Sequence, residues 1–194
     1  MFTGGPMAVN HEGGLRLTGA GAAVQRAASR WIAALAWRIA PPHCLLCGQH
    51  ADLERLDLCT ACLALLPPSG SGLELAPAPL QAVFAPWTYD WPVDRLVRAL
   101  KFGGDRCPAR VLGTLLARRR AALPAPLPQL LVPVPLHPRR LRHRGYNQAD
   151  ELCRYMAAAL LLPRSPSLLQ RTRATAAQSR ASGAERRGRM RGAF

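Results

Sequence analysis

Residues 131–152, LVPVPLHPRRLRHRGYNQADEL, run from an apolar segment through three prolines and a cluster of arginines into a helical pattern. The aliphatic residues at 130–134 predict a buried strand. The apolar residues that follow Asn147 recur at helical spacing and predict a helix over about 147–161. Strand, loop and helix in this order favour an α/β fold, in which a sheet presents ligands at the carboxyl ends of its strands.

The loop between the predicted strand and helix has the composition of an anion-binding segment. Its prolines restrict the backbone, and Gly145 permits an unusual turn just before the amides at the start of the helix. Arginine side chains and helix-terminal amides together would hold a doubly charged anion such as phosphate or pyrophosphate. A solvated basic loop is the alternative. The arginines concerned are Arg139, Arg140, Arg142 and Arg144.

Length and charge narrow the class of protein. A chain of 194 residues with 49% hydrophobic residues can form one mid-sized domain and a small additional module. Its net charge of +15 comes from 26 basic and 11 acidic residues. That balance favours anionic partners, namely phosphates, nucleic acid or an acidic membrane, and does not choose among them.

The first 40 residues predict a flexible tail at 1–23 and a short amphipathic helix at 24–40. The helix suits packing against the next module better than lying on a membrane surface, because its apolar stripe is narrow. Arginines interrupt it and it is too short to cross a membrane, so no transmembrane segment is predicted. The polar leader does not resemble a secretory signal, which favours a cytoplasmic location where cysteines stay reduced.

Two C-x-x-C pairs separated by eleven residues predict a zinc ribbon at 41–66. Four thiolates complete a tetrahedral shell and leave no open position for a catalytic water, so the zinc would be structural. Two disulfides or buried free thiols are the alternatives, and His43 or His50 would be substitute ligands. The predicted ligands are Cys44, Cys47, Cys59 and Cys62.

A segment rich in proline, serine and glycine predicts a linker at 67–79, followed by a larger domain at 80–194. Lys101 falls at the end of a predicted helix, where it would contact a ligand phosphate or complement the negative helix end. The larger domain is predicted to begin with a strand pair or bent strand at 80–89 and helices at 92–103 and 109–122.

Four sequence elements carry a resemblance to a known family. They are the two cysteine pairs, WTYDWPVDRLVRALKFGGD, PVPLHPRRLRHRGYNQADELC and QRTRATAAQSRASGAERRGRMRGAF. In this order they resemble the ComF/GntX family of phosphoribosyltransferase-like competence proteins over about residues 41–194. The resemblance implies a zinc ribbon, a type I phosphoribosyltransferase fold at 80–194 and a role in natural transformation and the use of external DNA.

The resemblance also implies roles for individual residues. It makes Lys101, Arg144, Gly145, Asn147 and Gln148 the phosphate- or pyrophosphate-binding set. The partners implied are pyrophosphate or phosphoribosyl pyrophosphate, bound weakly, together with single-stranded DNA and the competence machinery. Residues of a mobile hood over the site would be Arg171, Thr172, Arg173, Thr175 and Gln178.

The sequence departs from the family pattern at its end. A type I phosphoribosyltransferase needs an apolar strand ending in two acids, which hold the ribose and Mg²⁺, and a T-T-G loop for the 5′-phosphate. Neither is present, so we expect a truncated or split, catalytically incomplete member in which Mg²⁺ has no role without a completed site. The alternative to a ComF-type protein of DNA uptake is a zinc-ribbon module that binds nucleic acid and has no enzymatic activity.

Overall fold

The computed structural model describes residues 42–51, 56–70, 72–76, 79–174 and 192–194. They all belong to the second of two units, Pro42–Phe194. The tail and amphipathic helix predicted before residue 41, and the hood residues Thr175 and Gln178, lie outside the described residues. No helix in the described ranges is both long enough and apolar enough to cross a membrane.

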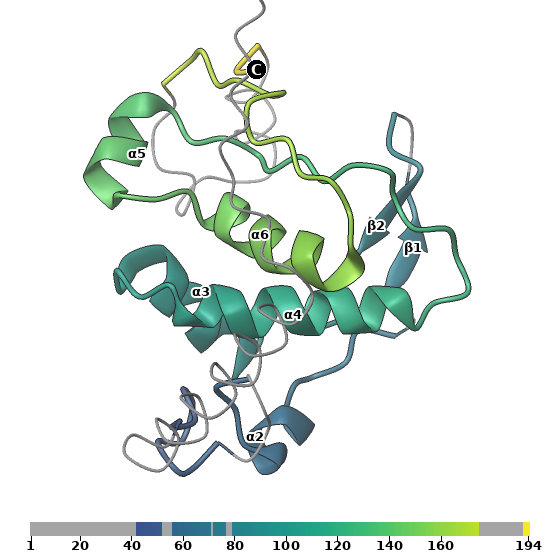
Figure 1. The fold of residues 1–194 in the computed structure, drawn as a ribbon, viewed down its shortest axis with the longest axis vertical. Helices are drawn as coiled ribbons and strands as arrows, with labels where there is room; N and C mark the ends of the chain where they lie inside the picture. The colour runs from purple at the N-terminus through teal and green to yellow at the C-terminus, as the bar shows by residue number, and fades with distance from the viewer. Residues whose placement is uncertain (1–41, 52–55, 71, 77–78, 175–191) are drawn as a thin grey trace, which may run out of the picture. The chain divides into compact units, whose positions relative to one another are not determined.

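Three helices form the frame of the larger domain: α3 (Val93–Phe102), α4 (Cys107–Ala121) and α6 (Gln148–Leu160). Each was predicted within two residues of its observed ends. Figure 1 shows α6 lying along α4, which is the most extensive packing between two elements. The helical periodicity of the sequence therefore determined these elements correctly.

The close approach of α4 and α6 depends on a glycine. A Cβ atom added at Gly113 would lie 2.8 Å from the carbonyl oxygen of Leu152 and 2.9 Å from the Cβ of Tyr155. Both distances are shorter than van der Waals contact, so a side chain at this position would separate the helices. Because α6 carries Gln148 at its first turn, this contact also sets where the predicted anion-binding residues lie.

The described sheet has two antiparallel strands, β1 (Leu73–Leu75) and β2 (Ala82–Phe84), with Leu73 opposite Phe84. Of the strand pair or bent strand predicted at 80–89, only β2 lies in that range, and its partner β1 lies within 67–79, which we expected to be a linker. That segment is hydrogen-bonded to the chain after β2: Thr88 donates to Pro67 (3.1 Å) and Ser69 donates to Pro86 (3.0 Å). The described residues of this segment therefore take part in the hairpin.

The strand predicted at 130–134 is wrong. Leu131 forms an isolated parallel bridge with Arg164, and no further strand is described there. Leu130 and Val134 are 38% and 54% exposed, although we expected them to be buried. Pro133 and Pro135 have no amide hydrogen, which prevents a continuous ladder at this segment. The fold described is therefore a mixed helix and strand arrangement, and the parallel α/β sheet is not seen in the described residues.

The arginine-rich segment that we predicted as a loop contains a short helix, α5 (Pro138–Arg144). His137 caps it, since its Nδ1 accepts a hydrogen bond from the amide of Arg139 at 3.2 Å, and Pro138 occupies the first helical position. The helix ends at Gly145, whose φ of 82° is left-handed, as the sequence predicted. A histidine before a proline was the available signal for this helix, and the run of charges obscured it.

The cysteine module shares one hydrophobic core with the helical frame. A short helix, α2 (Thr60–Ala64), carries Cys62 into this core. The ion pair between Arg110 of α4 and Asp57, a carboxylate that is only 8% exposed, joins the same two regions. Buried members of the core are Cys44, Leu46, Leu56, Leu58, Cys62, Leu66, Val93, Leu96, Val111, Leu112 and Leu115.

Candidate functional site

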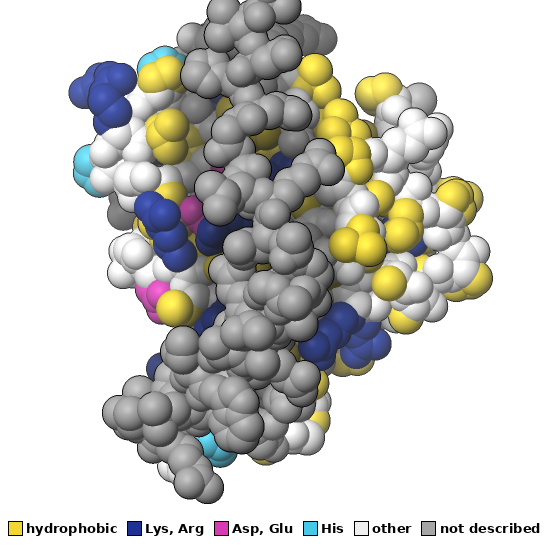
Figure 2. Space-filling view, viewed as in Figure 1, with side chains coloured by type: hydrophobic (Ala, Val, Ile, Leu, Met, Phe, Trp, Pro, Cys, Tyr) yellow, Lys and Arg dark blue, Asp and Glu magenta, His cyan; other side chains and the backbone are white. Residues whose placement is uncertain are grey.

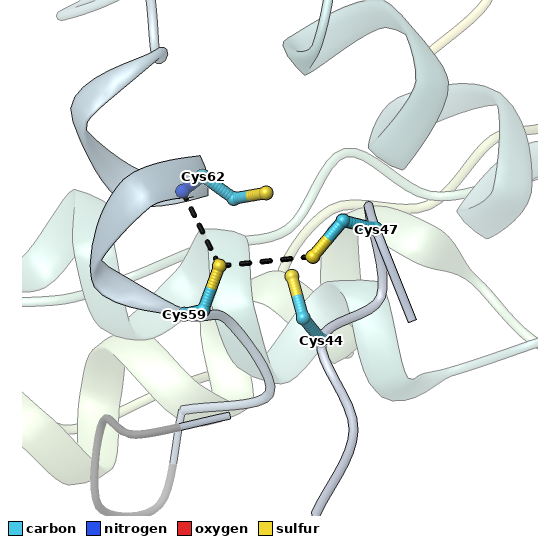
Figure 3. Close-up of side chains that lie close together, drawn as sticks. All are labelled: Cys44, Cys47, Cys59 and Cys62. Carbon is cyan, nitrogen blue, oxygen red and sulfur yellow. Dashed lines mark hydrogen bonds between the residues drawn. The ribbon is translucent and has the colours of Figure 1, made fainter. Parts of the chain in front are cut away.

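The two cysteine pairs form two tight turns that face each other (Figure 3). In the first, the amide of Gly48 donates to the carbonyl of Cys44 at 2.8 Å, and Gly48 has a φ of 76°. In the second, Cys59 caps α2, and its sulfur accepts a hydrogen bond from the amide of Cys62 at 3.4 Å. The local turns thus aim all four sulfurs at one point.

The four sulfurs are placed as metal ligands. They lie within 4.8 Å of one another, and Cys47 and Cys59 are 3.7 Å apart. Four sulfurs around a tetrahedral ion such as zinc are about 3.8 Å apart, given metal–sulfur bonds of about 2.3 Å. All four cysteines are free, so the cluster can hold a metal ion. His43 and His50, the possible substitutes, pair through their backbones and are not in the group.

Two thiols of the cluster, Cys44 and Cys62, have pKa values shifted in opposite directions. Burial raises the pKa of the Cys44 thiol, but backbone hydrogen bonds at Cys47, Cys59 and Leu46 outweigh it and lower the pKa to about 6. Burial, followed by hydrogen bonds with the other thiols, raises the pKa of Cys62 well above its usual value. A metal ion would therefore meet Cys44 as a ready thiolate and would displace a proton from Cys62.

The structure brings together two of the predicted phosphate-binding residues. The guanidinium of Arg144 donates to Oε1 of Gln148 at 2.7 Å, across the turn from α5 to α6. The same guanidinium lies 5.6 Å from the centre of the Phe102 ring, at the end of α3. Gly145 lies in the turn between α5 and α6. Arg144 is thus a half-buried cation whose position is fixed from two sides.

Lys101 and Asn147, two further residues of the predicted phosphate-binding set, make contacts of their own. Asn147 caps α6: its Oδ1 accepts from the amide of Ala149 at 3.1 Å, and its Nδ2 donates to the carbonyl of Val134 at 3.0 Å. Lys101 lies in the last turn of α3 with its Nζ 5.9 Å from the centre of the Tyr89 ring. Asn147 therefore shapes the site, and Lys101 adds a second cation beside an aromatic ring.

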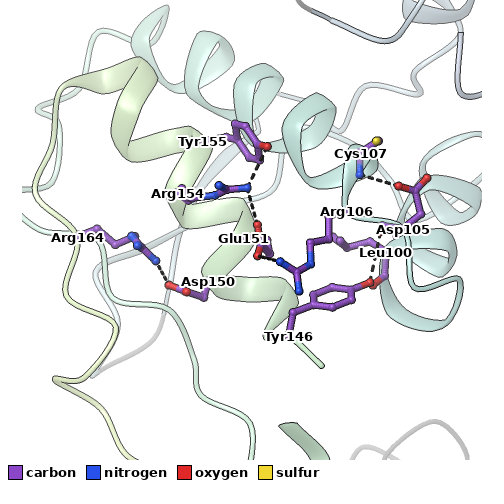
Figure 4. Close-up of polar contacts among 10 residues, drawn as sticks. All are labelled: Leu100, Asp105, Arg106, Cys107, Tyr146, Asp150, Glu151, Arg154, Tyr155 and Arg164. Atoms are coloured by element: carbon purple, nitrogen blue, oxygen red, sulfur yellow. Dashed lines mark hydrogen bonds and ion pairs between the residues drawn. The ribbon is translucent and has the colours of Figure 1, made fainter. Parts of the chain in front are cut away.

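Sequence reasoning missed Tyr146, which connects α3 to the start of α6. Its ring is 6% exposed, and its hydroxyl donates to the carbonyl of Leu100 and, at 3.3 Å, to that of Asp105 (Figure 4). The Arg106 guanidinium stacks 4.9 Å from the ring centre. No periodic pattern marks a single tyrosine in a charged turn, so the sequence offered no signal for this role.

The two acids in the first turn of α6 form ion pairs with arginines (Figure 4). Asp150 pairs with Arg164, and Glu151 pairs with Arg154 at 2.8 Å and Arg106 at 3.5 Å. Both acids already complement the positive end of the helix. The start of α6 is accordingly less positive than its arginine-rich approach suggested, whereas Arg144 and Lys101 have no carboxylate partner among the described ion pairs.

The predicted hood residues Arg171 and Thr172 contact the last described residues of the chain. The amide of Thr172 donates to the carbonyl of Ala193 at 3.1 Å, and Arg171 lies 5.5 Å from the centre of the Phe194 ring. Burial, and then repulsion by Arg140 of α5, lowers the pKa of Arg171. Arg173 contributes its carbonyl to Arg171 at 3.4 Å.

The described residues therefore define a helix and strand protein with a four-cysteine cluster and a basic site. DNA utilization protein YhgH of Salmonella typhi is 36% identical over 163 residues, which are 78% of this chain and 69% of that protein. Its counterpart in Escherichia coli K12 is 32% identical over 177 residues, or 79% and 77%. Competence protein F of Haemophilus influenzae is 32% identical over 110 residues, or 55% and 48%. No family model and no solved structure matches. The chain belongs to the ComF/GntX family.

Proposed function

We propose that this chain is a ComF-type protein that acts in the uptake and use of DNA, in the cytoplasm and together with the competence machinery. The observation that carries the proposal is its similarity to proteins named for DNA utilization and for competence. The net charge of +15 supports it, because cations that neutralise DNA phosphates release condensed counterions. Weak DNA binding without sequence preference is expected to follow from this charge.

The test of this proposal combines binding with genetics. Binding of labelled DNA by the full chain should weaken steeply as salt rises, and loss of the gene should reduce the use or the transformation of supplied DNA in its own host. A gene that encodes Cys59→Ser should fail to restore this phenotype, whereas one that encodes Cys153→Ser should restore it. Normal DNA use in the deletion strain would contradict the function.

For the cysteine cluster we propose one structural zinc ion. Four thiolates satisfy its preferred coordination and leave no position for water, which separates this site from catalytic zinc. Zinc binding at neutral pH should release fewer than four protons, because Cys44, with a pKa of about 6, is already largely ionised. Calorimetry in buffers of different ionisation enthalpy measures this number. Release of no protons, or zinc content near zero, would contradict a four-thiolate site.

For the larger domain we propose a phosphoribosyltransferase-like ancestry, with Arg144 and Lys101 as anion contacts and with Gly145, Asn147 and Gln148 shaping the site. The 194 residues should bind pyrophosphate weakly and should not release it from phosphoribosyl pyrophosphate. The only adjacent acids in the sequence, Asp150 and Glu151, are paired with arginines and are not placed to hold Mg²⁺ and ribose.

Calorimetry with pyrophosphate tests the anion contacts of this proposal. Arg144→Ala should abolish the weak binding, and Arg119→Ala, an exposed residue of α4, should leave it unchanged. Turnover of phosphoribosyl pyrophosphate by the 194-residue chain would contradict the proposal that it is catalytically inactive. Pyrophosphate binding that is unchanged in Arg144→Ala would contradict the assignment of Arg144 as an anion contact.

A second candidate function is a nucleic-acid-binding module without enzymatic activity. It is favoured by the ion pairs that Asp150 and Glu151 form with arginines, because these two acids are then not available to hold a Mg²⁺ ion for a transferase reaction. A parallel binding screen of phosphoribosyl pyrophosphate, single-stranded DNA and duplex DNA distinguishes the two. Tight binding of phosphoribosyl pyrophosphate would favour a phosphoribosyltransferase-like ligand site. Binding of DNA alone would favour the nucleic-acid-binding module.

A further inference from the structure

The end of α3 holds two aromatic rings that face solvent beside two cations. Tyr89 is 58% exposed and Phe102 is 74% exposed. The Lys101 ammonium lies 5.9 Å from the centre of the Tyr89 ring, and the Arg144 guanidinium lies 5.6 Å from that of Phe102. Lys101 and Phe102 both belong to the last turn of α3, so this turn contributes one member to each cation–aromatic pair. In Figure 2 basic side chains (dark blue) appear as separate groups on this face, interspersed with hydrophobic and uncharged surface.

The stability of the fold does not account for the exposure of Phe102. Burying a phenyl ring stabilises a protein more than an exposed cation–aromatic contact does. Both sides of the pair are nevertheless held in place. Gln148 fixes the Arg144 guanidinium at 2.7 Å, and the Tyr146 hydroxyl ties the turn before α6 to Leu100 in the same turn of α3 as Phe102. The ring and the cation are thus presented to solvent in a fixed arrangement.

The carboxylates in the described ion pairs do not contact the two cations of this surface. Asp94 pairs with Arg98, and Glu151 pairs with Arg106 and Arg154. Asp105 accepts a hydrogen bond from the amide of Cys107 at 2.8 Å. In the described part of the chain, neither Lys101 nor Arg144 forms an ion pair with a carboxylate. An anionic ligand that reaches the rings therefore meets two available cations.

We propose that Phe102 and Tyr89 stack on unpaired bases of single-stranded DNA while Arg144 and Lys101 contact the phosphates between them. The inference rests on the proposed function in DNA use and specifies its ligand as the unpaired strand. Exposed aromatic rings beside cations bind single strands without sequence preference, because every base has a π-face. In a duplex the neighbouring base pairs cover these faces, so the rings gain nothing from it.

The experiment measures binding of the full chain to a fluorescent oligothymidylate, to the same strand with abasic sites in place of its bases, and to a duplex. Phe102→Ala should weaken binding to the oligothymidylate about tenfold, given typical stacking contributions, and should leave the salt dependence unchanged because no charge is removed. Phe102→Trp should retain tight binding. Arg144→Gln should lower the slope of log affinity against log salt by about 1.

Leu75→Ala is the matched control, since Leu75 is a 95% exposed apolar residue of β1 and should have no effect. Wild type and Phe102→Ala should bind the abasic strand equally, because stacking is absent in both cases. Equal binding of the oligothymidylate by wild type and Phe102→Ala, or equal affinity for duplex and single strand, would overturn the stacking site and leave DNA binding intact. Absence of any DNA binding at low salt would instead contradict the proposed function itself.

Discussion

The cysteine cluster and the arginine site are built in opposite ways. The cluster gathers its ligands from Cys44 to Cys62, a short stretch in which two local turns aim the sulfurs at one point. The arginine site joins the end of α3 to the turn before α6, and its connecting hydrogen bond, from Tyr146 to Leu100, spans 46 residues. The first is encoded by spacing along the chain, whereas the second exists only when α3, α4 and α6 are packed.

Removal of one thiolate should give the largest effect and should show whether the two regions depend on each other. Cys59→Ser leaves three ligands, and structural zinc contributes about 10–16 kcal/mol in small zinc domains. We therefore expect the Cys59→Ser protein to lose its metal. Because Leu58 and Cys62 belong to the core that contains Val111, we also expect unfolding to lose its cooperativity across both regions. Metal analysis and thermal unfolding measure this. Cys153→Ser, on α6, is the control, and an unchanged melting curve for Cys59→Ser would show that the regions are independent.

A substitution at Gly113 should damage the arginine site without touching the metal. Alanine at an open helical position stabilises by about 1 kcal/mol relative to glycine. At Gly113 its Cβ would meet Leu152 and Tyr155 at 2.8 and 2.9 Å, so we expect destabilisation by about 1–3 kcal/mol. Urea unfolding, metal content and DNA affinity should be measured together, with Arg119→Ala as control. A stabilised Gly113→Ala protein would show that α4 and α6 do not pack this closely.

The ion pair between Asp57 and Arg110 tests the connection between the two regions directly. Arg110→Ala leaves the carboxylate of Asp57, which is 8% exposed, without its partner, and should cost about 1–3 kcal/mol of unfolding free energy. Arg98→Ala is the matched control, because the Arg98 side chain is 67% exposed beside Asp94, and a surface pair of this kind contributes less than about 1 kcal/mol. Equal losses for the two variants in urea unfolding would refute the special role of Arg110.

The smallest effect should come from the hydroxyl of Tyr146. Tyr146→Phe removes its hydrogen bonds to Leu100 and Asp105 and should cost about 0.5–1.5 kcal/mol. Burial raises the pKa of Tyr146, so the folded state holds the phenol proton more tightly than the unfolded state does. The resulting stabilisation is present below the unfolded pKa of about 10 and is lost as the pH rises above it.

The pH dependence of urea unfolding measures this contribution. The stability of the wild-type protein should decline more steeply above pH 10 than that of Tyr146→Phe. Tyr89→Phe, which changes an exposed phenol, should follow the wild-type curve. Parallel curves for the wild-type protein and Tyr146→Phe would contradict the buried hydroxyl.

Local patterns predicted the elements that depend on neighbouring residues. Local sequence signals predicted α3, α4 and α6, the two C-x-x-C pairs predicted the cysteine cluster, and Gly145 predicted the unusual turn before α6. The strand at 130–134 failed because aliphatic composition does not reveal whether a partner strand is present. Helix α5 was missed because its arginines were interpreted as an anion-binding loop, and Pro138 was not recognised as the first residue of a helix.

By itself the sequence determined helices α3, α4 and α6, the four-cysteine cluster and the basic charge, since each follows from local sequence pattern or from composition. Only the tertiary structure decided that Asp150 and Glu151 pair with arginines and that Phe102 stays exposed beside Arg144. The physical reason is that the partners come from separate segments: Arg106, before α4, reaches Glu151 of α6, Arg164 reaches Asp150, and Arg144 of α5 lies beside Phe102 of α3. Contacts between residues far apart along the chain carry no local signature, and packing alone selects among the many cations that the sequence offers.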